Sequence, residues 1–137
     1  MFAQQWKKED EQEKAKKVGE YTVLIVDDTE TNVDILVELL ADSYEISVAL
    51  DGETALEIVD EDSPDLILLD IKMPGMDGFE VCQRLKSDDK TAQIPIIFIS
   101  GEPDEKDAGL QAGVVDFLTK PIDPDSVLEA IKKNVGT

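Results

Sequence analysis

Histidine is absent from this chain of 137 residues, and cysteine occurs once, as Cys82. Without histidine, imidazole acid–base catalysis, histidine metal ligation and phosphohistidine chemistry within the chain are excluded. A single cysteine excludes an internal disulfide and suits a reducing cytoplasm, so we expect Cys82 to be a small buried hydrophobe on a helix. No apolar stretch approaches the roughly 18 residues of a membrane span, and the charged N-terminus lacks a signal-peptide pattern. We therefore expect a cytoplasmic protein without membrane contact.

Basic residues are also scarce. The chain has 13 Lys and Arg and 32 Asp and Glu, which give a net charge of −19. Residues 1–20 hold five lysines and five acids, so the whole negative excess lies in residues 21–137. Such a surface is repelled by phosphate backbones, which predicts no direct contact with nucleic acid. It attracts divalent cations and basic partner surfaces instead.

The chain divides into a charged N-terminal tail or helix, residues 1–20, and one domain, residues 21–137. Apolar residues are almost absent from the first segment after Trp6 and show no heptad repeat, so a coiled coil is not supported. We interpret this segment as a frayed tail, with docking through Phe2 and Trp6 as the alternative. From Tyr21 onward, five apolar strands alternate with five amphipathic helices. They include a short helix over residues 104–112, a last strand over residues 114–119, and a last helix that Asp123 or Asp125 can cap. This alternation predicts an α/β domain with a parallel sheet covered by helices on both faces.

Four of the predicted strands end on polar residues that suit phosphate chemistry. These residues are Asp27, Asp28, Asp70, Ser100 and Lys120. In a parallel sheet such ends meet at one edge, where open α/β sheets bind ligands. Three neighbouring carboxylates favour a divalent cation, and oxygen ligands without histidine point to Mg²⁺ or Mn²⁺. A carboxylate can act as the nucleophile of phosphoryl transfer, while a metal, a lysine and a hydroxyl neutralise the charge of the transferred group.

The motifs around these residues resemble the receiver domain of two-component response regulators. They are Val26-Asp27-Asp28, Leu68 to Gly78 (LLDIKMPGMDG), Ile99-Ser100-Gly101 and Asp116 to Pro121 (DFLTKP). The resemblance runs from about Tyr21 to Val135. It implies a flavodoxin-like (βα)5 doubly wound parallel sheet with strand order 2-1-3-4-5, and a cis peptide bond before Pro121.

The resemblance also implies a role for each site residue. Asp70 is expected to accept a phosphoryl group from a phosphohistidine on a sensor histidine kinase or phosphotransfer protein. Lys120 and Ser100 are expected to contact the phosphoryl oxygens. The implied Mg²⁺ ligands are Asp27, Asp28, Asp70 and the backbone carbonyl of Lys72. The chain is then a signalling domain and not an enzyme, with self-catalysed phosphotransfer and autodephosphorylation as its only chemistry.

Two further pairs of residues are predicted to govern the switch and its lifetime. By the resemblance, Ser100 is expected to move toward a phosphoryl group on Asp70, and the space that it leaves lets Phe117 turn inward. A permanent core position for Phe117 is the alternative. Because phenylalanine lacks a polar atom, a switch through Phe117 acts by exposing or burying apolar area. Lys72 and Glu102 lie two residues beyond Asp70 and Ser100, at positions that flank the mouth of the site in the resembled family. We predict a salt bridge between them that impedes the hydrolytic water. Two independent solvated charges are the alternative.

Three other functions are weighed against this reading. A haloacid-dehalogenase-type aspartyl phosphatase also uses an aspartate and Mg²⁺, but it needs a second acid where this chain has Lys72. A flavin-binding electron carrier needs a hydroxyl- or glycine-rich phosphate loop after the first strand, where this chain has acidic Asp27-Asp28-Thr29-Glu30. An unphosphorylated adaptor is disfavoured because all five site groups are present.

The output of the switch is not encoded in a motif. No DNA-binding or catalytic module follows Lys133, so a stand-alone receiver and a piece of a longer regulator are both compatible with the sequence. By resemblance, the last helix, the last strand and the preceding helix form the expected surface for an unknown output partner. A homodimer on activation is a further possibility.

Overall fold

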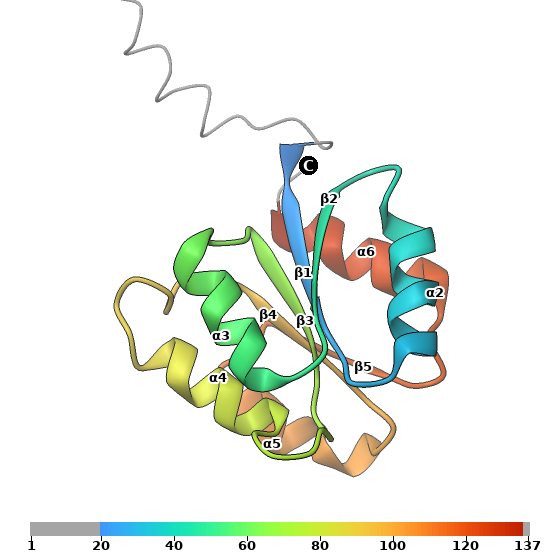
Figure 1. Cartoon of the computed structure of the whole chain (residues 1–137). Helices are drawn as coiled ribbons and strands as arrows, with labels where there is room; N and C mark the ends of the chain where they lie inside the picture. Colours follow the sequence, from blue (N-terminus) through green and yellow to red (C-terminus); the bar gives the residue numbers. More distant parts are fainter. Residues whose placement is uncertain (1–19, 136–137) are drawn as a thin grey trace, which may run out of the picture.

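The computed structural model describes residues 20–135, so the predictions for Phe2 and Trp6 lie outside the described residues. Its centre is a sheet of five parallel strands in the order β2-β1-β3-β4-β5 (Figure 1). This is the flavodoxin-like order that the resemblance implied. The strands are β1 (Thr22–Val26), β2 (Glu45–Ala49), β3 (Leu66–Asp70), β4 (Ile96–Ser100) and β5 (Asp116–Thr119).

Helices cover both faces of the sheet (Figure 1). On one face lie α2 (Glu30–Leu40) and α6 (Pro124–Val135), and their apolar residues share a core with the sheet. The other face carries α3 (Gly52–Glu61), α4 (Gly78–Lys86) and α5 (Lys106–Gln111), the last preceded by the 3-10 helix η2 (Pro103–Glu105). Five strands and five α-helices therefore alternate in the described part of the chain, as predicted.

The two cores are separated by the alternation of side chains along each strand. Leu24 and Val26 join the core under α3 and α4, whereas Val23 and Ile25 join the core under α2 and α6. In β3 and β4 every residue is buried, which suits strands that are covered on both faces. The predicted buried position of Cys82 on a helix is confirmed.

Local sequence signals set the ends of several helices. Asp51 and Asp77 each accept a hydrogen bond from the backbone N–H three residues later, at 2.8 and 3.0 Å, and thereby cap α3 and α4. Of the two candidate caps of α6, Asp123 is the one that accepts from the N–H of Ser126, at 3.2 Å. Gly113 has a φ of +101°, a conformation that favours glycine, and it ends the turn after α5.

Two elements near the C-terminus differ in length from their predictions. The helix expected over residues 104–112 is a 3-10 turn followed by the six-residue helix α5, because Pro103 opens the turn with a short-range hydrogen-bond pattern. The last strand begins at Asp116 and not at Val114. No helix among residues 20–135 has both the length and the apolar character needed to cross a membrane.

Candidate functional site

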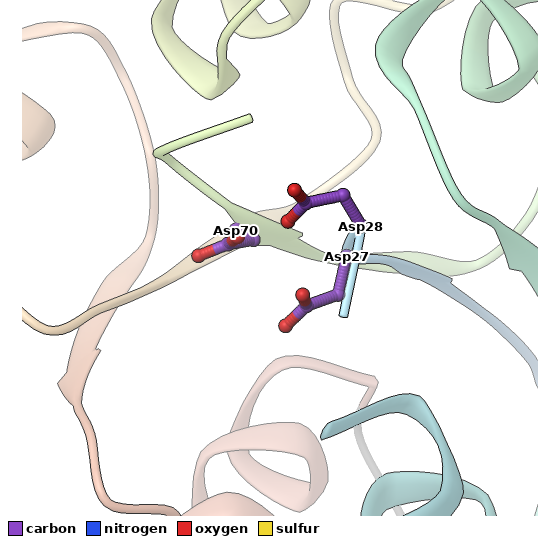
Figure 2. Close-up of side chains that lie close together, drawn as sticks. All are labelled: Asp27, Asp28 and Asp70. Carbon is purple, nitrogen blue, oxygen red and sulfur yellow. The ribbon is translucent and has the colours of Figure 1, made fainter. Parts of the chain in front are cut away.

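Three aspartates meet at the carboxyl ends of the neighbouring strands β1 and β3 (Figure 2). Carboxylate oxygens of Asp27, Asp28 and Asp70 lie within 4.8 Å of one another. Asp27 and Asp70 are buried, with exposed fractions of 2% and 4%, whereas Asp28 is exposed. The predicted meeting of these three carboxylates at one sheet edge is confirmed.

The loops around the cluster hold two of its members in place. Asp27 accepts hydrogen bonds from the backbone N–H of Thr29 at 2.9 Å and from the Asn32 amide at 3.3 Å, so the start of α2 orients its carboxylate. Gly78 donates its N–H to the carbonyl of Ile71 at 2.8 Å and packs against the backbone of Asp70. A Cβ at Gly78 would lie 2.5 Å from the Asp70 carbonyl oxygen, so only glycine allows this close approach.

Lys120 reaches the cluster from the end of β5. Its Nζ lies 3.0 Å from Oδ1 of Asp70 and 3.8 Å from Oδ2 of Asp27, and its side chain is 26% exposed. The backbone N–H of Lys120 donates to the carbonyl of Ser100 at 2.8 Å, which ties this loop to β4. The Lys120–Pro121 bond is cis, as predicted. An ammonium group beside a buried carboxylate can also neutralise oxygens of a phosphoryl group attached there.

The electrostatics of the cluster favour a bound cation. The pKa of Asp70 is raised from 3.8 to about 6, and burial is the largest cause. The hydrogen bond and charge of Lys120 oppose this rise, whereas the charges of Asp27 and Asp28 add to it. One ammonium therefore does not fully compensate the carboxylates. A divalent cation supplies the missing positive charge, and carboxylate oxygens are the ligands that Mg²⁺ and Mn²⁺ prefer. The residues present thus fit such an ion.

Ser100 lies at the same sheet edge but is engaged elsewhere. Its Oγ donates to Oε1 of Glu105 at 2.8 Å and accepts from the backbone N–H of Glu102 at 2.9 Å. Among the described residues, the hydrogen bonds of this hydroxyl thus do not include Asp70. Sequence reasoning missed Glu105, because acids are frequent in this segment and nothing in the sequence distinguishes the one that reaches Ser100.

Lys72 and Glu102 form the predicted ion pair, with 3.7 Å between Nζ and Oε2. Their side chains are 70% and 51% exposed, so the pair contributes little to stability. Phe117 is buried and packs in the core with Phe98. A Cβ on Gly109 of α5 would lie 3.2 Å from the Phe117 ring, so the helix is seated directly against this side chain.

The family of the chain follows from comparison with known proteins. The model of the response regulator receiver domain matches residues 23–132. The chain belongs to this family. The receiver domain is a signalling module and not a classical enzyme, and the family implies a cognate histidine kinase as a partner. This result excludes the phosphatase and flavin-carrier alternatives.

Curated relatives of this receiver domain are longer than the chain. Response regulator PleD of Caulobacter vibrioides is 52% identical over 104 residues, which are 74% of this chain and 23% of PleD. The DNA-binding dual master transcriptional regulator RpaA of Synechocystis is 36% identical over 113 residues, which are 80% of this chain and 47% of RpaA. The chain therefore spans less than half the length of either relative.

Solved structures show the same fold. Chemotaxis protein CheY4 of Vibrio cholerae is 30% identical, with a TM-score of 0.78 over 83% of this chain and 98% of that one. The receiver domain of a sensor histidine kinase from Pseudomonas aeruginosa is 24% identical, with a TM-score of 0.79 over 85% and 98%. That structure holds a magnesium ion in its active-site cleft. At this identity the likeness shows the fold alone.

Proposed function

We propose that Asp70 is the phosphoacceptor of this receiver domain and that Mg²⁺ supports the transfer. The observation that carries the proposal is the contact of the buried Asp70 carboxylate with Lys120 at 3.0 Å, inside a cluster of three carboxylates. The proposed ligands of the ion are Asp27, Asp28, Asp70 and the backbone carbonyl of Lys72, and Mn²⁺ fits the same oxygen donors.

In the proposed reaction, one carboxylate oxygen of Asp70 forms a bond to phosphorus while the bond between phosphorus and the donor breaks. The donor is a phosphohistidine of a sensor histidine kinase or phosphotransfer protein, as the receiver family implies, and this chain contains no histidine that could supply it. Lys120 neutralises charge on the transferred oxygens, and the Ser100 hydroxyl donates to one of them after transfer. A Mg²⁺ ion held by the three carboxylates would supply further neutralisation of the transferred charge.

The signal is proposed to leave the domain through protein contacts. We assign the output surface to α5, β5 and α6. Leu110 of α5 and Val115, which precedes β5, are large apolar side chains that are each 44% exposed. Homodimer formation on activation is one use of this surface. The acidic charge of the domain argues against direct contact with nucleic acid. The cytoplasmic location stays a prediction.

Incubation with a small phosphodonor and Mg²⁺, followed by intact-mass measurement, tests the phosphoacceptor. Wild type and Asp34→Asn, which changes an exposed aspartate of α2, are expected to gain one labile phosphoryl group. Asp70→Asn is expected to gain none, because an amide oxygen is a poor nucleophile. A labile adduct that persists in Asp70→Asn contradicts the assignment.

A further inference from the structure

The proposed phosphoryl transfer at the acidic cluster does not account for the hydrogen bond between Ser100 and Glu105. Ser100 is 2% exposed, so its hydroxyl has little access to water as an alternative partner. A hydroxyl has one proton to donate, and here Oε1 of Glu105 accepts it at 2.8 Å. Ser100 therefore cannot donate to Glu105 and to a phosphoryl oxygen on Asp70 at the same time.

The local backbone brings Glu105 to Ser100. Glu105 is the last residue of η2, and its N–H donates to the carbonyl of Glu102 at 3.0 Å. The same turn places the N–H of Glu102 on the Ser100 hydroxyl at 2.9 Å. Between residues 101 and 108 Glu105 is half-buried while its neighbours are exposed. The turn thus folds one acid of an exposed acidic segment inward onto Ser100.

We propose that Glu105 is a positioning residue that holds the Ser100 hydroxyl away from Asp70 until a phosphoryl group competes for its proton. The inference rests on the proposed function of Asp70. A charged acceptor holds a hydroxyl more strongly than a neutral one. Glu105 therefore opposes the stabilisation of the phosphoryl group by Ser100 and favours the unphosphorylated arrangement.

The affinity for beryllofluoride, a phosphoryl analogue, measures this competition in the presence of Mg²⁺. Titration calorimetry on the full chain is expected to give a Kd roughly tenfold lower for Glu105→Ala than for wild type. Glu105→Gln keeps an acceptor without the charge, so a smaller gain is expected. Asp104→Asn removes the same charge from the exposed neighbouring residue and is expected to change the Kd by less than about twofold.

A double-mutant cycle with Ser100→Ala separates positioning from a general effect of charge. In the Ser100→Ala background, Glu105→Ala is expected to leave the Kd unchanged. An equal gain with and without Ser100, or no gain in Glu105→Ala, overturns the positioning role. If Glu105→Ala lowers the unfolding temperature, the same comparison of Kd values with and without Ser100 is made with Glu105→Gln instead. Wild type that binds no beryllofluoride overturns the proposed function, and the positioning role with it.

Discussion

The groups around Asp70 and the groups around Ser100 share one sheet edge but differ in their bonding. Lys120 already contacts Asp70 at 3.0 Å, and Asp27 is oriented by the start of α2. The Ser100 hydroxyl instead donates its hydrogen bond to Glu105. Under the proposed function, the first set needs no rearrangement before a phosphoryl group arrives, whereas the second must exchange a hydrogen bond.

This difference separates transfer from signalling. Charged groups placed before the reaction stabilise developing charge without reorganisation, which suits the Asp70 side. A switch needs two arrangements whose populations a ligand can shift, which suits the Ser100 side. The helix α5 follows η2 directly and packs against Phe117, so we expect a rearrangement at Ser100 and Glu105 to reach the proposed output surface. The predictions below test each side in turn.

Loss of the Lys120 ammonium is expected to have the largest effect. Lys120→Ala removes the cation beside Asp70, and we expect phosphoryl uptake from a small donor with Mg²⁺ to slow by about 100-fold or more. Lys132→Ala, which removes an exposed lysine from α6, serves as the control and is expected to react at the wild-type rate. A near wild-type rate in Lys120→Ala would show that the Asp70 side is not arranged for transfer.

Removal of the Asp70 charge is expected to stabilise the fold without Mg²⁺. The pKa of Asp70 in the folded protein, about 6, lies above its ordinary 3.8, so the folded state binds the proton more tightly and loses stability as pH rises from about 4 through 6. At about pH 7, Asp70→Asn is expected to raise the free energy of unfolding by on the order of 1–3 kcal/mol.

Urea unfolding of wild type, Asp70→Asn and the exposed control Asp34→Asn measures this effect. The gain in Asp70→Asn is expected to shrink when Mg²⁺ is added, and again at about pH 4, where wild-type Asp70 is protonated. Destabilisation of Asp70→Asn at neutral pH, relative to the control, would mean that the Lys120 contact outweighs the burial of charge.

The exposed pair at the mouth of the site is expected to have the smallest effect. Lys72→Ala breaks the 3.7 Å contact with Glu102, and we expect dephosphorylation of Asp70 to quicken by at most about fivefold, since exposed pairs contribute up to about 1 kcal/mol. Decay of the phosphorylated protein, followed by intact mass, gives the rate. An unchanged rate would remove the proposed influence on the hydrolytic water.

The sequence predicted the fold and the acidic cluster well because both depend on repeating local signals. Apolar runs that end on Asp27, Asp70 and Ser100 suffice to predict a parallel sheet with one polar edge. The relation of Lys72 to Glu102 was also predictable, since both occupy positions that flank the site mouth in the receiver family. These features follow from chain geometry that neighbouring residues determine.

The engagement of Ser100 could not be predicted in the same way. It depends on the 3-10 turn that Pro103 opens and on which carboxylate of an acidic segment folds inward. The close packing of Phe117 against Gly109 likewise depends on the tertiary packing of α5, which no local pattern specifies. The bonding of Ser100 and the packing of Phe117, which distinguish the two sides of the site, could therefore be found only from the structure.

A pair of crystal structures, without ligand and with Mg²⁺ and beryllofluoride, tests the central comparison most directly. We predict that Lys120 stays beside Asp70 in both, while Ser100 Oγ donates to Glu105 in the first and to the analogue in the second. A Ser100 hydroxyl that points to Asp70 before the analogue binds, or that stays on Glu105 afterwards, would contradict the account.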